Sequence, residues 1–330
     1  MVPKLMRIIV AVLLCACACQ SAGAQAIHLR YAQAYSSLQT IFALPLLVAE
    51  RNGYFVREGL DFSMLAVPGG GERLVTALDD GTADLAHVPT PYLIQASLAG
   101  SDAVAIAAEF NNPVYSFLAK PEIKTYADLK GKLIGLAAEP TSITISIRKL
   151  LALHGLRNED FRSRFVDGTP ERLICLTAGD CDAVPLGQPQ DYSAIRRGYR
   201  LLGLSTDAVP EFLYTVTAVR RFWASTHKDT VVRYVRALSS AFKFIRDPEK
   251  RDDVLKAIAD TTGFGEGNAQ LTLSLYLEPD RGILPKQGEI NLKGIEQVIS
   301  MMADAGTIKE PLPAAERFVD LQYLEAAGVQ

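Results

Sequence analysis

The sequence predicts an α/β protein of two lobes, each with a mixed, mostly parallel sheet flanked by helices. Strand and helix signals alternate in short units, which is typical of a parallel sheet covered by helices. The alternation is interrupted at residues 111–113, and a second series of units begins there. The chain has 330 residues. One hydrophobic core rarely organises so many residues, so we expect two lobes.

The first series of units lies between residues 27 and 110. Alternating or continuous apolar runs predict its strands, and apolar residues at three- and four-residue steps predict its helices. The expected strands are 27–33, 61–67, 83–88 and 103–110, and the expected helices are 44–51, 72–78 and 91–98.

The second series begins after residue 113 and is followed by a helical C-terminal region. Its expected strands are 114–119, 132–136, 163–167, 181–186 and 199–202, and its expected helices are 141–154 and 170–178. An extended apolar stretch follows at 212–219. From residue 226 the chain is almost wholly helical, and apolar residues at helical steps between Val231 and Ile245 predict an amphipathic helix on a core.

The two series join near residues 111–116 and again near 210–216. This arrangement indicates that the second lobe is inserted into the first, and such a double crossing makes a hinge. We therefore predict a discontinuous first lobe and an inserted second lobe. The expected boundaries are 25–112 and 215–330 for the first lobe and 113–214 for the second.

Residues 1–24 are typical of a cleaved export signal. Lys4 and Arg7 form a basic start, residues 8–18 form an apolar segment too short to span a bilayer, and Ala22-Gly23-Ala24 fits a small-residue cleavage site. Lipoprotein processing is the alternative, because Leu14-Cys15-Ala16-Cys17 partly fits a lipid-attachment box. The cleaner cleavage site favours a free periplasmic protein, and no later apolar run approaches the roughly 20 residues of a membrane span.

Charge and cysteine content narrow the classes of function. Cleavage would leave 32 of the 34 basic side chains against 37 acidic ones, and this mildly acidic balance predicts no nucleic-acid binding. Only Cys175 and Cys181 follow the signal segment. They are either a disulfide or two buried thiols, since sequence alone does not place their Cα atoms within bridging distance.

Candidate ligand residues lie in strand-to-helix loops, because ligands of open α/β sheets bind beyond the carboxyl ends of the strands. The glycines 69–71 precede a helix, where free N–H groups could bind an anionic or carbonyl oxygen; a plain tight turn is the alternative. Thr141 and Ser142 open another helix and either cap it or leave its N–H groups free for a ligand. Thr90 offers a hydroxyl in a third loop.

The sequence predicts no catalytic site, no metal site and no cofactor. The four histidines show no metal-ligand spacing, no nucleophile elbow occurs, and Cys175 has no recognisable partner base. The histidines are His28, His87, His154 and His227. We interpret His87 as a strand-end residue rather than a base.

Several stretches together resemble the bacterial ABC-transporter solute-binding proteins of the nitrate, sulfonate, taurine and pyrimidine-precursor group. The likeness covers nearly all of the chain after the signal segment and keeps the family's order. The matching stretches are 44–50 (LPLLVAE), 53–55, 58–60, 69–71, 78–84 (LDDGTAD), 124–135 (KTYADLKGKLIG), 168–170, 179–183, 187–189, 305–308 and 319–324.

This resemblance implies a type II periplasmic-binding fold, in which two crossover strands join the lobes and a small-molecule ligand lies in the cleft. It also implies permease subunits in the inner membrane as partners and a separate ATPase, and we expect a monomer. The ligand residues that it implies are Gln33, Tyr35, Ser36, Ser37, Gly69, Gly70, Gly71, Thr90, Asn111, Thr141, Ser142, Gln188 and Tyr214. Where relatives often have P-G-S-S, this chain has Glu139-Pro140-Thr141-Ser142, which places a carboxylate near the cleft.

The resemblance is less specific for the solute than for the fold. No Arg or Lys lies on the predicted ligand loops, so we expect an organic acid rather than an inorganic anion. Tyr35, Phe110, Phe212 and Tyr214 either stack on its body or pack in the core. A pyrimidine or thiamine-precursor heterocycle is the alternative solute. A precursor-synthase-like enzyme, which would need a Cys-rich motif, and a sensor accessory protein are the alternatives of another class.

Overall fold

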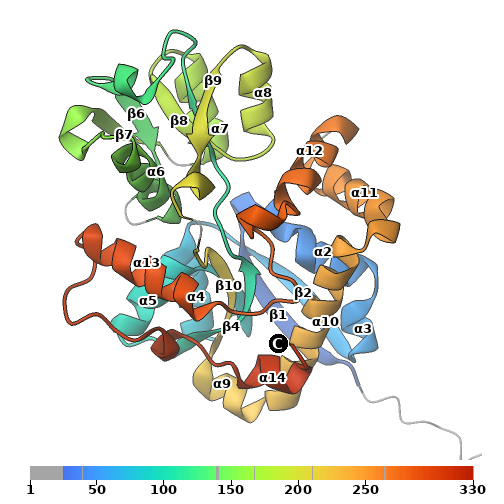
Figure 1. The fold of residues 1–330 in the computed structure, drawn as a ribbon. Helices are drawn as coiled ribbons and strands as arrows, with labels where there is room; N and C mark the ends of the chain where they lie inside the picture. Colours follow the sequence, from blue (N-terminus) through green and yellow to red (C-terminus); the bar gives the residue numbers. More distant parts are fainter. Residues whose placement is uncertain are drawn as a thin grey trace, which may run out of the picture.

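The computed structural model describes residues 25–38, 40–138, 141–166, 168–209, 211–263 and 265–329. The expected export signal at 1–24 and the dipeptide Glu139-Pro140 lie outside these residues. The described chain forms two five-stranded sheets flanked by helices, and Figure 1 shows one sheet with its helices above the other. This architecture confirms the predicted α/β fold class.

The first sheet contains strands from both ends of the chain. Its order is β2-β1-β3-β10-β4. The strand β1 is parallel to both of its neighbours, β2 and β3, whereas β10 is antiparallel to both of its neighbours, β3 and β4. The strands are β1 (Ile27–Ala34), β2 (Leu60–Val67), β3 (Leu85–Pro89), β4 (Ala103–Phe110) and β10 (Thr215–Arg220). Every residue of β4 is buried, as its almost continuously apolar sequence predicts.

Helices from both halves of the chain pack on the first sheet or on one another beside it. The longest, α10, packs its apolar stripe against α2 and α3, as its helical spacing of apolar residues predicts. The helices are α2 (Leu44–Arg51), α3 (Tyr54–Arg57), α4 (Gly71–Asp79), α5 (Thr90–Leu98), α9 (Arg221–Thr226), α10 (Lys228–Arg246), α11 (Arg251–Thr262), α12 (Glu266–Tyr276), α13 (Leu292–Asp304) and α14 (Gln322–Ala327).

The second sheet is formed by the middle of the chain alone. Its order is β7-β6-β8-β5-β9, with β6 parallel to β7 and β8, and β5 antiparallel to β8 and β9. The strands are β5 (Ser116–Ala119), β6 (Leu133–Leu136), β7 (Arg162–Phe165), β8 (Ala183–Leu186) and β9 (Arg200–Leu204). The helices around it are α6 (Ser142–Leu153), α7 (Thr169–Thr177) and α8 (Gln190–Arg196).

The chain crosses between the two sheets at residues 111–115 and at residues 205–214. The first crossing leaves β4 at Phe110 and enters β5 at Ser116, so it is short enough to keep the ends of these strands close. The strands of residues 27–110 and 215–220 share one sheet, in agreement with an inserted second lobe. The lobe boundaries themselves stay a prediction.

Cys175 and Cys181 form a disulfide, with Cα atoms 5.2 Å apart. Of the two interpretations that the sequence left open, the structure therefore shows the bridge. It joins α7 to the segment before β8 and lies in a small apolar cluster of the second lobe with Leu176 and Val184.

Three short α-helices were not predicted from the sequence. The helix α3 has 4 residues, α9 has 6 and α8 has 7, so none of them is long enough to show an apolar periodicity. The strand β3 also begins at Leu85 rather than at residue 83. The Asp84 side chain, just before it, instead accepts hydrogen bonds from the main chain and guanidinium of Arg30.

Replacing Gly294 by alanine is expected to destabilise the first lobe. A Cβ at this position of α13 would lie 2.7 Å from the carbonyl carbon of Phe212 and 2.9 Å from the nitrogen of Leu213, in the second crossing. These main-chain atoms cannot turn aside as a flexible side chain would, and such overpacking costs about 1–3 kcal/mol. Urea denaturation followed by circular dichroism would measure the loss.

Gly267→Ala in α12 is the matched control. A Cβ there would meet nothing within 4 Å. Alanine in place of a helical glycine stabilises by about 0.5–1 kcal/mol. Equal changes in the free energy of unfolding for the two variants would contradict the close approach of α13 to the crossing.

Candidate functional site

Four segments of the first lobe meet at one edge of its sheet. The strands β1, β3 and β4 end there, and β10 begins there because it runs antiparallel between β3 and β4. The main chain closes the edge: the Thr90 N–H donates to the Tyr214 carbonyl at 3.0 Å, and the Tyr214 N–H donates to the Phe110 carbonyl at 3.0 Å. The predicted ligand residues Gln33, Thr90, Asn111 and Tyr214 therefore share this carboxyl edge.

The second lobe contributes residues from the corresponding edge of its own sheet. Ser142 is the first residue of α6, which follows β6, and Gln188 follows β8. Thr141 caps α6: its Oγ1 accepts from the Thr144 N–H at 3.3 Å and donates to the Ala138 carbonyl at 2.8 Å. Of the two roles predicted for the Thr141 hydroxyl, the structure shows the cap.

Side-chain hydrogen bonds join the two lobes beside these edges. The Tyr276 hydroxyl of α12 donates to Gln188 Oε1 at 3.2 Å, and Arg281 Nη1 donates to Thr206 Oγ1 at 2.9 Å. The two crossings also touch each other, since the hydroxyls of Tyr115 and Tyr214 lie 3.0 Å apart. The predicted ligand residue Gln188 thus lies where the two lobes touch, and Tyr214 lies where the two crossings meet.

A buried carboxylate orients Gln188. Asp191 Oδ2 accepts from Gln188 Nε2 at 3.0 Å and from the Ser116 hydroxyl at 2.7 Å, which leaves Gln188 Oε1 facing Tyr276. Burial raises the pKa of the Asp191 carboxyl, although the hydrogen bonds from Ser116 and Tyr192 act in the opposite direction. Sequence reasoning missed Asp191 and Tyr276, because no local pattern links them to Gln188.

Two of the three glycines before α4 are required by the fold itself, independently of any ligand. Gly69 has a φ of +104°, which side chains rarely allow, and a Cβ on Gly71 would overlap the ring of Tyr92 in α5. Gly70 has ordinary extended dihedrals and nothing within 4 Å of its Cβ direction. Backbone conformation and packing thus explain Gly69 and Gly71 but not Gly70.

The predicted aromatic residues separate into one exposed and three buried side chains. Tyr35 is 71% exposed, whereas Phe110, Phe212 and Tyr214 are buried. Phe42, which the sequence did not single out, packs edge-on against Phe110 and Tyr214, with ring centroids 5.1 and 5.5 Å apart. Burial raises the pKa of the Tyr214 hydroxyl well above its usual value, so the group stays protonated at neutral pH.

The serines predicted beside Tyr35 belong to the turn after β1. The Ser37 carbonyl accepts from Thr40 Oγ1 at 2.8 Å, and the Ser37 side chain is half-buried. The Ser36 side chain lies outside the part of the chain that the structure describes. The assignment of these serines to a ligand stays a prediction.

Several predicted ligand residues carry a buried oxygen without a hydrogen-bond partner. They are Gln33 Oε1, Thr90 Oγ1, Asn111 Oδ1 and Ser142 Oγ. The hydroxyl of Thr215, at the start of β10, shares this property. A buried polar group left unpaired costs about 1–3 kcal/mol. Such a cost at both facing edges is an expected property of a site completed by a ligand.

Behind the carboxyl edge of the first sheet lies a buried polar network centred on Glu109. Its carboxylate accepts from the Tyr31 and Thr217 hydroxyls and contacts His87 Nδ1. Tyr234 of α10 lies 2.9 Å from Thr217 Oγ1. The predicted interpretation of His87 as a strand residue rather than a base is therefore in agreement with a place inside this network.

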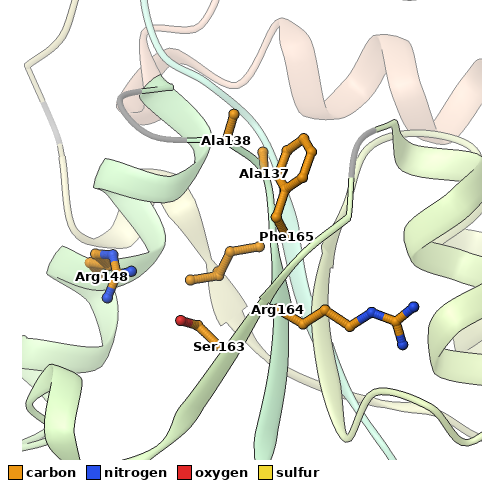
Figure 2. A pocket seen from close by; sticks show the side chains of 7 residues that line it. Ala137, Ala138, Arg148, Ser163, Arg164 and Phe165 are labelled. Atoms are coloured by element: carbon orange, nitrogen blue, oxygen red, sulfur yellow. The ribbon is translucent and has the colours of Figure 1, made fainter.

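Two open pockets lie away from the facing edges. One pocket, of about 250 Å³, lies in the second lobe between α6 and β7. Figure 2 shows Arg148 of α6 and Ser163 and Phe165 of β7, which line it. Arg148 Nη1 donates there to Asn158 Oδ1 at 2.5 Å. The other pocket, of about 420 Å³, lies at the amino end of β4 beside Arg221 and Arg317. Neither pocket is lined by a predicted ligand residue.

Most residues of the two edges, though not Gln33 of β1, lie in a part of the chain that matches a known protein family. A family model described as NMT1/THI5 like matches residues 42–251, which is more than half of the chain. The chain belongs to the NMT1/THI5-like family. This result confirms the resemblance recognised from the sequence motifs.

Known proteins that are similar to this chain include components of importers. YtlA of Bacillus subtilis strain 168, a candidate binding protein, is 25% identical over 242 residues, covering 68% of this chain and 69% of YtlA. The ligand-binding component of an ABC-type import system from Staphylococcus aureus superposes with a TM-score of 0.74 at 12% identity, covering 91% and 99% of the two chains. The periplasmic aliphatic sulphonate binding protein SsuA from Escherichia coli gives 0.70 at 18% identity, covering 89% and 92%.

The fold by itself does not decide between binding and catalysis. The desulfurization enzyme DSZB also superposes, with a TM-score of 0.66 at 15% identity, covering 91% of this chain and 98% of DSZB. Within the described residues, no three His, Cys, Asp or Glu side chains are grouped so that they could hold a metal ion. In the same part of the chain, no helix is both long and apolar enough to cross a membrane.

Removing the Glu109 carboxylate is expected to destabilise the first lobe strongly. Glu109→Ala leaves the buried Tyr31 hydroxyl, Thr217 hydroxyl and His87 ring without their common partner, at a cost of about 3 kcal/mol. Glu109→Gln keeps an acceptor for the hydroxyls and places a donor toward His87, so the expected loss is smaller. Urea denaturation of both variants would measure the difference.

Glu296→Gln is the control for Glu109→Gln, because Glu296 is exposed on α13 and its replacement should change the free energy of unfolding by less than about 0.5 kcal/mol. A Glu109→Ala variant as stable as the parent protein would show that the network does not hold the strands together.

Proposed function

We propose that the chain is the extracytoplasmic solute-binding component of an ABC importer and captures a small organic acid between its two lobes. The observation that supports the proposal best is the set of buried, unpaired oxygens at the two facing edges. Gln33, Thr90 and Asn111 come from the first lobe, and Ser142 comes from the second. A solute that satisfies atoms of both lobes binds the closed arrangement more tightly and so favours it.

An acidic end of the solute has a suitable partner at the start of α6. This helix has 12 residues, and Ser142 at its first position keeps a hydroxyl that is buried and unpaired. The cap from Thr141 satisfies the Thr144 N–H, and the dipole of the helix still favours negative charge at its first residues. Since the predicted ligand residues include no Arg or Lys, the charge of a small inorganic anion would have no ionic partner among them.

A pyrimidine or related heterocycle is the second candidate. The Gln33 and Asn111 side-chain oxygens favour it, because an amide oxygen accepts hydrogen bonds and does not donate them. Ring N–H and amino groups of a heterocycle would supply those donors.

The remaining parts of the proposal follow from the importer role. The expected partners are permease subunits that recognise the closed lobes, the expected location is the periplasm, and the expected form is a monomer that catalyses no reaction. A sensor accessory protein would share the solute and the closure but would bind a different membrane protein. Stimulation of ATP hydrolysis by a reconstituted permease complex would separate these roles.

Solute binding can be measured with a thermal-shift panel of ethanesulfonate, taurine, benzoate, nitrate and aminopyrimidine. A solute present at a hundred times its Kd stabilises the folded protein by about 2.7 kcal/mol, so at least one organic member is expected to raise Tm. Small-angle scattering with the same compound should then show a smaller radius of gyration, because the lobes close. A panel without any shift in Tm would contradict the proposed function.

Gly70→Val is expected to weaken binding of the solute so identified by about tenfold or more, because its side chain would fill the open space before α4. Gly265→Val is the matched control: both glycines precede a helix with extended dihedrals and have nothing within 4 Å of the Cβ direction. The two variants should lose similar stability without solute. Equal affinities for the solute would remove Gly70 from the site.

A further inference from the structure

The carboxyl edge of the first sheet carries a row of unpaired buried oxygens that includes one residue outside the predicted site. The row consists of Gln33 Oε1, Thr90 Oγ1, Asn111 Oδ1 and Thr215 Oγ1. Its members belong to the ends of β1, β3 and β4 and to the start of β10. Four neighbouring segments therefore each place one unsatisfied polar atom at the same edge.

Thr215 lies at the centre of this row. It pairs with Pro89 of β3 on one side and with Phe110 of β4 on the other, so the residues that follow its partners are Thr90 and Asn111. The Thr215 side chain is 1% exposed. A fully buried hydroxyl flanked by two other unpaired groups is rare in a protein interior, where polar atoms normally find partners.

Thr217 shows that the surrounding interior can satisfy a hydroxyl. It lies two residues further along β10, on the same face of an alternating strand, and is equally buried. Its Oγ1 donates to Glu109 at 2.6 Å and lies 2.9 Å from the Tyr234 hydroxyl. The missing partner of Thr215 is therefore a property of the edge and not of buried threonines on this strand.

The two amides of the row define which chemical group fits it. Gln33 Nε2 donates to the Phe42 carbonyl at 3.4 Å, which leaves Oε1 as the unpaired atom. In Asn111 the unpaired atom is likewise the oxygen. Amide oxygens only accept hydrogen bonds, whereas threonine hydroxyls adapt to either role.

We infer that Thr215 is a specificity-determining residue of the solute site and that the solute presents N–H or O–H donors to the first-lobe edge. The inference rests on the proposed function and narrows its solute class: an anionic group faces the start of α6, and the donor-bearing part of the molecule faces the sheet. An acid whose body carries no donor would leave the Gln33 and Asn111 oxygens unpaired, at a cost in affinity.

A comparison of Thr215→Val with Thr217→Val tests the row without any solute. Valine keeps the shape of threonine and removes the hydroxyl. Thr215→Val should leave Tm of the ligand-free protein unchanged or raise it, because no hydrogen bond is lost. Thr217→Val should lower Tm by about 2–4 °C or more, because it removes the partner of two buried groups. Equal losses of Tm in the two variants would overturn the inference.

Matched compounds test the donor requirement. The probes are para-aminobenzoate with para-dimethylaminobenzoate, and aminopyrimidine with dimethylaminopyrimidine. Within each pair only the methylated member lacks the N–H donors. The amino member should raise Tm more than its methylated partner in the parent protein, and the difference should shrink in Thr215→Val.

Equal shifts within both pairs, or none from either amino compound, would overturn the donor assignment. If ethanesulfonate or benzoate raises Tm while the amino compounds do not, the proposed function stands and this inference fails. If no compound of either panel raises Tm, the proposed function fails, and the two valine variants alone decide whether the row is unsatisfied.

Discussion

The double crossing of the chain between its two sheets is the constraint on which the site depends. The chain leaves the carboxyl end of β4, enters β5 after only residues 111–115, and returns from β9 to the start of β10. Because both crossings start and end at the same edges, those edges face each other whatever the loops contain. Loops after parallel strands then bring the proposed ligand groups together from both sides, at the general location of ligand sites in open α/β sheets. The hydrogen bond from Tyr276 to Gln188 shows how close the two lobes lie.

The buried Glu109 network lies directly behind the first-lobe edge and holds its strands together. The position of the Glu109 side chain depends on an irregular pairing between β4 and β10. The pairing of β10 passes from Phe110 to Ala108 and skips Glu109, as in a β-bulge. Bulges redirect side chains, and they occur often beside functional sites. With its carboxylate held by groups from β1, β3 and β10, Glu109 fixes the four strands just behind the unpaired row. A binding surface built on rigid elements holds its polar groups in position before the solute arrives.

Periodicity was sufficient to predict most strands and helices, because each of them buries one face or both. It failed for α3, α8 and α9, which are too short for a repeat to appear. The motif resemblance identified the loops, and the structure brings Gln33, Thr90, Asn111 and Tyr214 to one edge. The motifs could not identify Thr215 and Asp191. The position of Thr215 follows from the order of the strands, and Asp191 bonds to Ser116, which is distant in the sequence. The buried role of Glu109 could have been predicted from the sequence, because it is the only charged residue in the apolar strand from Ala103 to Phe110.

Stability and binding make opposite demands on the same few atoms. Elsewhere in the first lobe, the buried polar groups of Asp84 and Thr217 have partners, in accordance with the cost of leaving them unpaired, whereas the Tyr323 hydroxyl of α14 has none. At the facing edges of both lobes, the buried hydroxyls of Thr90, Thr215 and Ser142 have no hydrogen-bond partner. Natural proteins tolerate such local inconsistencies mainly where function requires them, and compensate with the stability of the surrounding structure. The interior satisfies Thr217 but not its neighbour Thr215, and in the site that we propose the missing partner of Thr215 comes from the solute, whose chemistry must match the unpaired atoms.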